Sequence, residues 1–135
     1  MINRKGYSLV ELTIVLLCVG LLAAAVIPII RGRYDAARWS EGRAIMGDIA
    51  NGLRLHIAEK GSDFVAVPTL AQLGITPENQ NGAYFLCGES GTGNFSWVVN
   101  DDYPMDFLVT ATAPSSIVSP SLVTLNHTGT FTDTE

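Results

Sequence analysis

The carboxylate of Glu11 is the side chain whose position most strongly suggests a function. It follows a short basic leader with Arg4 and Lys5, and residues 12–30 after it include no charged residue. That apolar run has roughly the length that a helix needs to cross the core of a bilayer. An ionisable group at the edge of such a run is costly in lipid, which favours a functional role for Glu11. The alternative is an ordinary signal anchor in which Glu11 lies at headgroup level.

A second group of oxygen-bearing side chains falls in one expected loop and consists of Asn100, Asp101, Asp102 and Asp106. Carboxylate and amide oxygens are the ligands that Ca²⁺ prefers, although the spacing differs from that of an EF-hand. We interpret Asp101, Asp102 and Asp106 as a candidate calcium site. The alternative is a solvated acidic turn with no metal.

Other motifs that could indicate catalysis are incomplete. Gly88, Gly91 and Gly93 lack the following Lys-Ser or Lys-Thr of a phosphate-binding loop. His56 and His127 have no partner at a spacing typical of metal binding or catalysis. We therefore expect neither an enzyme nor a cofactor apart from the candidate calcium ion.

One long helix must carry Glu11, and we expect it from Tyr7 to about Lys60. Its apolar half contains Pro28, which removes a backbone donor and should kink or locally open the helix. Its second half is amphipathic, with an apolar stripe that should pack on the rest of the chain. The stripe consists of Ile45, Met46, Ile49, Ala50, Leu53 and Ile57. Gly61 is a plausible stop for this helix.

The sequence after Gly61 is typical of short strands and turns. We expect a short helix over residues 69–74 and three strands over residues 83–87, 95–99 and 107–112. Residues 122–125 add an edge strand, and the end of the chain should be loose. The predicted fold is α+β, with a long N-terminal helix whose apolar half protrudes and whose second half packs on a small antiparallel sheet.

Charge and cysteine content exclude several classes. The 135 residues carry a formal net charge of -5, which argues against nucleic acid as the main partner. Four arginines follow the apolar run, at Arg31, Arg33, Arg38 and Arg43. They fit either DNA capture or helix-surface pairs with Asp35 and Glu41, and the pairs are the simpler interpretation. Cys18 lies within the apolar run and Cys87 lies in the part of the chain expected to fold in water, so we do not expect a disulfide between them.

The N-terminal segment also carries a family resemblance. Lys5-Gly6-Tyr7-Ser8-Leu9-Val10-Glu11-Leu12 resembles the processing motif of the type IV pilins and the type II secretion pseudopilins. In that family a prepilin peptidase cuts after the glycine and N-methylates the new N-terminus. The resemblance makes Gly6 the last leader residue and Tyr7 the first mature residue, where Phe is usual. Glu11 matches the family's characteristic glutamate, and Pro28 matches a common helix proline.

The resemblance implies a leader (residues 1–6), a transmembrane and assembly helix (7–30), an amphipathic helix half (31–60) and a β head (61–135). It implies a bacterial inner-membrane protein with an extracytoplasmic head, which later joins a pilus or pseudopilus filament. The implied partners are copies of itself, the prepilin peptidase and the inner-membrane assembly machinery. The short head and the missing C-terminal cysteine pair favour a pseudopilin slightly. The alternative function is a monomeric membrane-anchored binding module, including a DNA-uptake minor pilin.

Overall fold

The computed structural model describes residues 8–63, 65–76, 81–100 and 106–134. The side chains of Pro28 and Ser62 are not described. Two compact units divide the chain, Met1–Tyr34 and Asp35–Glu135, and each is described by itself. The first unit is helical wherever it is described beyond Ser8, and the second contains a helix segment, a sheet and the loops between them.

Helix α1 covers Leu9–Lys60, so its end agrees with the sequence prediction and Ser8 lies just before its start. The carbonyl of Ser8 accepts the backbone N–H groups of Glu11 and Leu12 at 3.0 and 3.2 Å. The helix ends at Lys60, and Gly61 follows it with a positive φ of 60°, a conformation that glycine adopts easily. A short 3₁₀ helix, η1 (Gly61–Asp63), follows. The expected start at Tyr7 lies outside the described residues.

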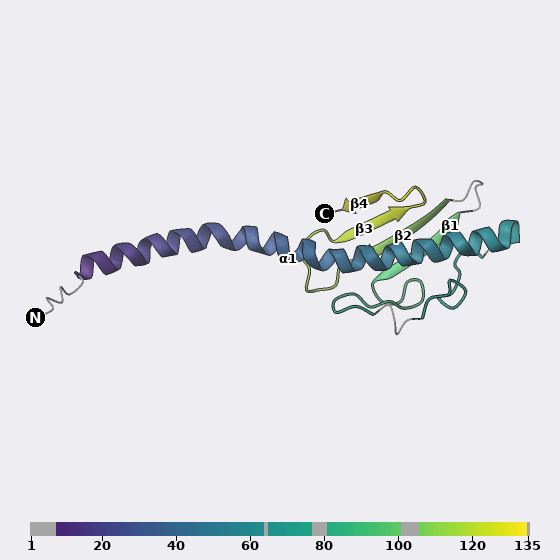
Figure 1. The fold of residues 1–135 in the computed structure, drawn as a ribbon, viewed down its shortest axis with the longest axis horizontal. Coiled ribbons are helices and arrows are strands. Elements are labelled where there is room, and N and C mark those ends of the chain that lie inside the picture. The colour runs from purple at the N-terminus through teal and green to yellow at the C-terminus, as the bar shows by residue number, and fades with distance from the viewer. Residues whose placement is uncertain (1–7, 64, 77–80, 101–105, 135) are drawn as a thin grey trace, which may run out of the picture. The chain divides into compact units, whose positions relative to one another are not determined.

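A four-stranded antiparallel sheet forms the β part of the second unit, with the strands in chain order (Figure 1). The strands are β1 (Phe95–Asn100), β2 (Asp106–Thr112), β3 (Leu122–Asn126) and β4 (Phe131–Thr134). The first two confirm the predicted strands over residues 95–99 and 107–112. The register pairs Trp97 with Val109 and Val109 with Leu125, so these three buried side chains share one face.

The core of the second unit joins α1 to that face of the sheet. The predicted apolar stripe of α1 is buried at every position, and Leu53, Ile49 and Met46 are completely inaccessible to solvent. One hydrophobic cluster contains the stripe, Trp39 and the inward side chains of β1, β2 and β3. These sheet residues are Phe95, Trp97, Val99, Phe107, Val109, Ala111, Val123 and Leu125. Each large side chain buried in this way contributes roughly 1.5–3 kcal/mol of hydrophobic stabilisation.

The strand predicted over residues 83–87 is wrong. Only an isolated bridge, Cys87 to Gly93, occurs there. The backbone N–H groups that a strand would pair are bound by side chains instead. Those of Tyr84 and Phe85 donate to Glu41, that of Leu86 to Asn94 and that of Cys87 to Asn81, each at 2.9 Å. Two nearby asparagines and the distant Glu41 therefore hold this apolar segment in an irregular loop.

Two further predictions need correction. The segment over residues 69–74 forms hydrogen-bonded turns rather than a helix, although the N–H of Gln72 donates to the hydroxyl of Thr69 at 3.3 Å and Gly74 has φ 71°. The end of the chain is also not loose. Residues 131–134 form β4, which pairs with β3, so the predicted edge strand over 122–125 is an inner strand.

Two glycines of α1 provide a matched test of helix packing. A Cβ on Gly52 would lie 2.9 Å from the carbonyl oxygen of Leu73, whereas a Cβ on Gly47 would meet nothing within 4 Å. Alanine favours a helix over glycine by about 0.5–1 kcal/mol, so Gly47→Ala should stabilise the protein by that amount. Gly52→Ala should instead destabilise it by about 1–3 kcal/mol, because the backbone at Leu73 must move. Urea unfolding in detergent measures both, and an equal gain in the two variants would contradict the packing argument.

Candidate functional site

The first candidate site lies at the start of α1. Glu11 is in the first turn of the helix and is exposed. The apolar side chains that follow it are exposed as well, for example Leu17 at 65% and Leu22 at 68%. The most apolar stretch of 18 residues in α1 has none of its residues buried within the structure. By length and composition alone, α1 can cross a membrane. An exposed apolar helix of this length needs a covering of lipid or of other helices.

Several predicted site residues lie outside the described part of the chain. These are Gly6 and Tyr7 at the processing site and Asp101 and Asp102 of the candidate calcium site. The backbone of α1 continues through Pro28. We expect the local opening near Pro28 in a filament, where neighbouring subunits can satisfy the loosened backbone better than lipid can, and it stays a prediction.

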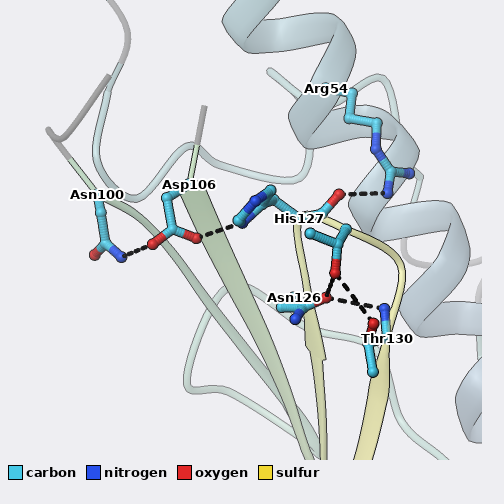
Figure 2. A network of polar contacts seen from close by, with 7 residues as sticks. Arg54, Asn100, Asp106, Asn126, His127 and Thr130 are labelled. Carbon is cyan, nitrogen blue, oxygen red and sulfur yellow. Dashed lines mark hydrogen bonds and ion pairs between the residues drawn. The ribbon is translucent and has the colours of Figure 1, made fainter. Parts of the chain in front are cut away.

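Asp106, the described member of the candidate calcium site, belongs to a polar network at one end of the sheet (Figure 2). One carboxylate oxygen accepts the side-chain amide of Asn100 at 3.1 Å, and the other lies 2.8 Å from Nδ1 of His127. The bond from Asn100, followed by that from His127, lowers the pKa of Asp106. In the same network Arg54 of α1 donates to the carbonyl of His127 at 3.3 Å. The network therefore links α1, β1, β2 and the turn after β3.

Among the described residues no group of three or more His, Cys, Asp or Glu side chains could hold a metal ion. Asp106 alone contributes one carboxylate, and a calcium ion prefers six to eight oxygens. A bound calcium would also compete with His127 for the oxygen of Asp106. Calcium binding through Asp101, Asp102 and Asp106 therefore stays a prediction. A calcium ion at Asp106 would have to displace the contacts that Asp106 makes in the polar network.

Three arginines of α1 stack on rings of the second unit and bind polar groups there, which the sequence did not predict. Arg38 lies 5.0 Å from the ring centroid of Tyr84, Arg43 lies 5.8 Å from that of Phe131 and Arg54 lies 5.3 Å from that of Phe107. Arg38 is also 3.8 Å from Asp35, as predicted. Arg43, however, pairs with Asp133 of β4 at 2.7 Å. Glu41, the other carboxylate expected to form helix-surface pairs, binds the backbone N–H groups of Tyr84 and Phe85 instead.

Glu41 holds the loop over residues 83–87 on α1. One carboxylate oxygen accepts the N–H groups of Tyr84 and Phe85. Burial raises the pKa of this carboxyl, but the backbone bonds from Phe85, Tyr84 and Ala83 outweigh burial and lower its pKa overall. No local pattern in the sequence indicates this contact, because its two sides are more than forty residues apart.

The lowered pKa of Glu41 predicts a loss of stability in acid. The ionised carboxylate contributes stability above its ordinary pKa, and that contribution is lost as the pH falls through the lower folded pKa. Glu41→Gln should reduce the free energy of unfolding by about 1 kcal/mol near pH 7, because a neutral acceptor forms weaker bonds. The deficit should shrink in acid. Unfolding at several pH values checks this, with Glu59→Gln on the exposed side of α1 as control; equal behaviour of the two variants would contradict the role of Glu41.

Comparisons with known proteins add no assignment to this geometry. Scans against protein-family models, curated proteins and solved structures each found no match.

Proposed function

We propose that this chain is the membrane-inserted precursor of a structural subunit of an extracytoplasmic helical filament. The filament is a type II secretion pseudopilus or a type IV pilus, with a slight preference for the pseudopilus. The observation that carries the proposal is the exposed apolar half of α1 with the single carboxylate of Glu11 in its first turn. The resemblance of residues 5–12 to the prepilin processing motif supports the same function.

The physical argument concerns what covers the apolar half of α1. A helix satisfies its own backbone in lipid, and a bundle of like helices covers the same side chains. Because both environments suit that surface, a subunit can pass from the membrane into a filament. A head-to-tail contact between copies that does not close into a ring extends into a fibre. The compact second unit then forms the surface of that fibre.

Processing of the leader provides the first test of this function. The mature protein in sheared fibres should lack residues 1–6 and carry one methyl group on Tyr7, and intact-mass spectrometry measures both. Gly6→Leu should block cleavage, because the peptidase must approach the backbone closely at this glycine. A mature mass that retains Arg4 and Lys5 would contradict the proposal. So would a protein that is a stable monomer in detergent, binds a ligand tightly and never appears in fibres; this result would favour the anchored binding module.

A further inference from the structure

The loop between β2 and β3 presents one apolar side chain to solvent from a firmly held backbone. Ile117 is buried in the core, and the indole N–H of Trp39 donates to the carbonyl of Pro120 at 3.0 Å. Between these two attachments the N–H of Val118 donates to the carboxylate of Asp35 on α1 at 3.3 Å. Val118 is 85% exposed, more than any other large hydrophobic side chain among the described residues. The loop is therefore fixed on α1 with Val118 directed outward.

An aromatic ring and a cation adjoin this loop. Arg38 donates to the carbonyl of Ser116 at 2.5 Å, and its guanidinium lies over the ring of Tyr84. Tyr84 is 43% exposed, and its backbone is bound to Glu41. Arg38 therefore links the loop between β2 and β3 to the loop over residues 83–87. We call Val118, Arg38 and Tyr84 the Val118 surface.

The position of this surface along the chain limits how far it can lie from the membrane. Asp35, which binds Val118, follows Ile30 at the end of the apolar run by five residues. Five residues span at most about 18 Å in any conformation. Whatever direction the second unit takes, the Val118 surface therefore stays within reach of the bilayer boundary.

Charge and side-chain type agree with that location. Four of the eight Lys and Arg residues of this acidic chain, from Arg31 to Arg43, follow the apolar run within thirteen positions. Arg31 and Arg33 are exposed. Cations next to an aromatic ring and an aliphatic side chain are typical of segments that bind the headgroup layer, where lysine and arginine face phosphates and apolar groups enter the acyl boundary.

We infer that the Val118 surface binds the lipid headgroup layer of the membrane that holds α1, before the subunit enters a filament. The inference rests on the proposed function, because it requires the apolar half of α1 to be inserted. Val118 enters the boundary between headgroups and acyl chains, while Arg38 and Tyr84 lie at headgroup level. Anionic phosphates match the charge of Arg31 and Arg33. The lipid is the favoured occupant, because only five residues join Asp35, which holds Val118, to the apolar run that the bilayer covers.

Fluorescence quenching on the full chain tests this contact. Val118→Cys, in a Cys18→Ser background, is labelled with an environment-sensitive fluorophore and reconstituted into vesicles of phosphatidylcholine with phosphatidylglycerol. Some of the lipids carry a nitroxide on the headgroup. The matched control is Leu55→Cys, an exposed apolar position of α1 that follows Arg38 by seventeen residues. Cys87 is buried, and the Cys18→Ser protein alone measures any labelling there.

Quenching at position 118 should exceed that at position 55 severalfold, and it should fall when phosphatidylcholine alone forms the vesicle. The difference should persist in nanodiscs that hold one copy of the chain. Equal quenching at the two positions in inserted protein would overturn the inference. A difference that disappears in single-copy nanodiscs would also overturn it and would assign the surface to a second copy. Carbonate extraction separates these results from a failure of the proposed function, because a chain that is not inserted is removed from the vesicles.

Discussion

Leu53→Asp is expected to unfold the second unit or to release the sheet from α1. Leu53 is completely buried in the centre of the apolar stripe, within the same cluster as the inward side chains of the sheet. The substitution removes a large apolar side chain, which costs about 2–5 kcal/mol, and also places an unpaired carboxylate in the core. The sum exceeds about 4 kcal/mol, and native domains are stable by only about 5–15 kcal/mol.

Leu55→Asp provides the matched control for this substitution. Leu55 is on the same helix two residues later and is 64% exposed. The same chemical change there should alter the free energy of unfolding by less than about 1 kcal/mol. Trp39 and Trp97 are both buried, so their emission reports unfolding of the full chain in detergent. Normal unfolding of Leu53→Asp, or equal effects of the two variants, would show that another face of α1 forms the core.

The elements that the sequence predicted correctly depend on local periodicity. Ile45, Ile49, Leu53 and Ile57 repeat every four residues, and all four are buried on one face of α1. Residues 95–99 are rich in aromatic and β-branched side chains, with Phe95, Trp97 and Val99 at alternate positions, and they form β1. In both cases a single segment carries the whole pattern, so no knowledge of distant residues is necessary.

The elements that were wrong depend on contacts between distant residues. Residues 83–87 have the composition of a strand, but Glu41 of α1 binds the N–H groups that a strand would use. Residues 131–134 are mostly polar, and they form β4 because β3 offers an unpaired edge and Arg43 binds Asp133. Here one signal was available, since Asn126 to Gly129 is typical of a turn and Gly129 has φ 85°. A hairpin could have been predicted from it.

Among the candidate sites too, a local pattern was predicted correctly and contacts between distant residues were missed. Glu11 was found because a lone charge beside an apolar run is a local pattern, and the structure places it in the first turn of α1. The bonds of Asp106 to Asn100 and His127 were missed, because His127 is brought to β2 only by the pairing of β2 with β3. The sequence indicated a group of oxygen ligands but not the partners that already occupy one of them.

Glu11→Leu is expected to insert and to be cleaved after Gly6, but to enter filaments poorly. In a filament this carboxylate would lie among apolar helices, where an unpaired charge costs several kcal/mol. Cleavage creates one cation nearby, the free amine of Tyr7, and the family resemblance suggests that Glu11 pairs with that amine on a neighbouring subunit. Such a pair neutralises both charges and sets the axial register, since apolar helices alone could slide past one another. N-methylation leaves the amine positively charged and is therefore compatible with the pair.

Two substitutions of Glu11 separate the effect of its charge from the effect of its side-chain length. Glu11→Leu should shift mature protein from sheared filaments to the membrane pool, and wild-type protein in the same cell should restore fibres. Glu11→Asp should assemble better than Glu11→Leu but worse than wild type, because it retains the charge on a shorter side chain. The ratio of filament protein to membrane protein measures each variant, and cleavage after Gly6 serves as the control for correct insertion. If Glu11→Leu assembles at the wild-type ratio, the pairing with Tyr7 is wrong, and Glu11 is a headgroup-level residue of an anchor.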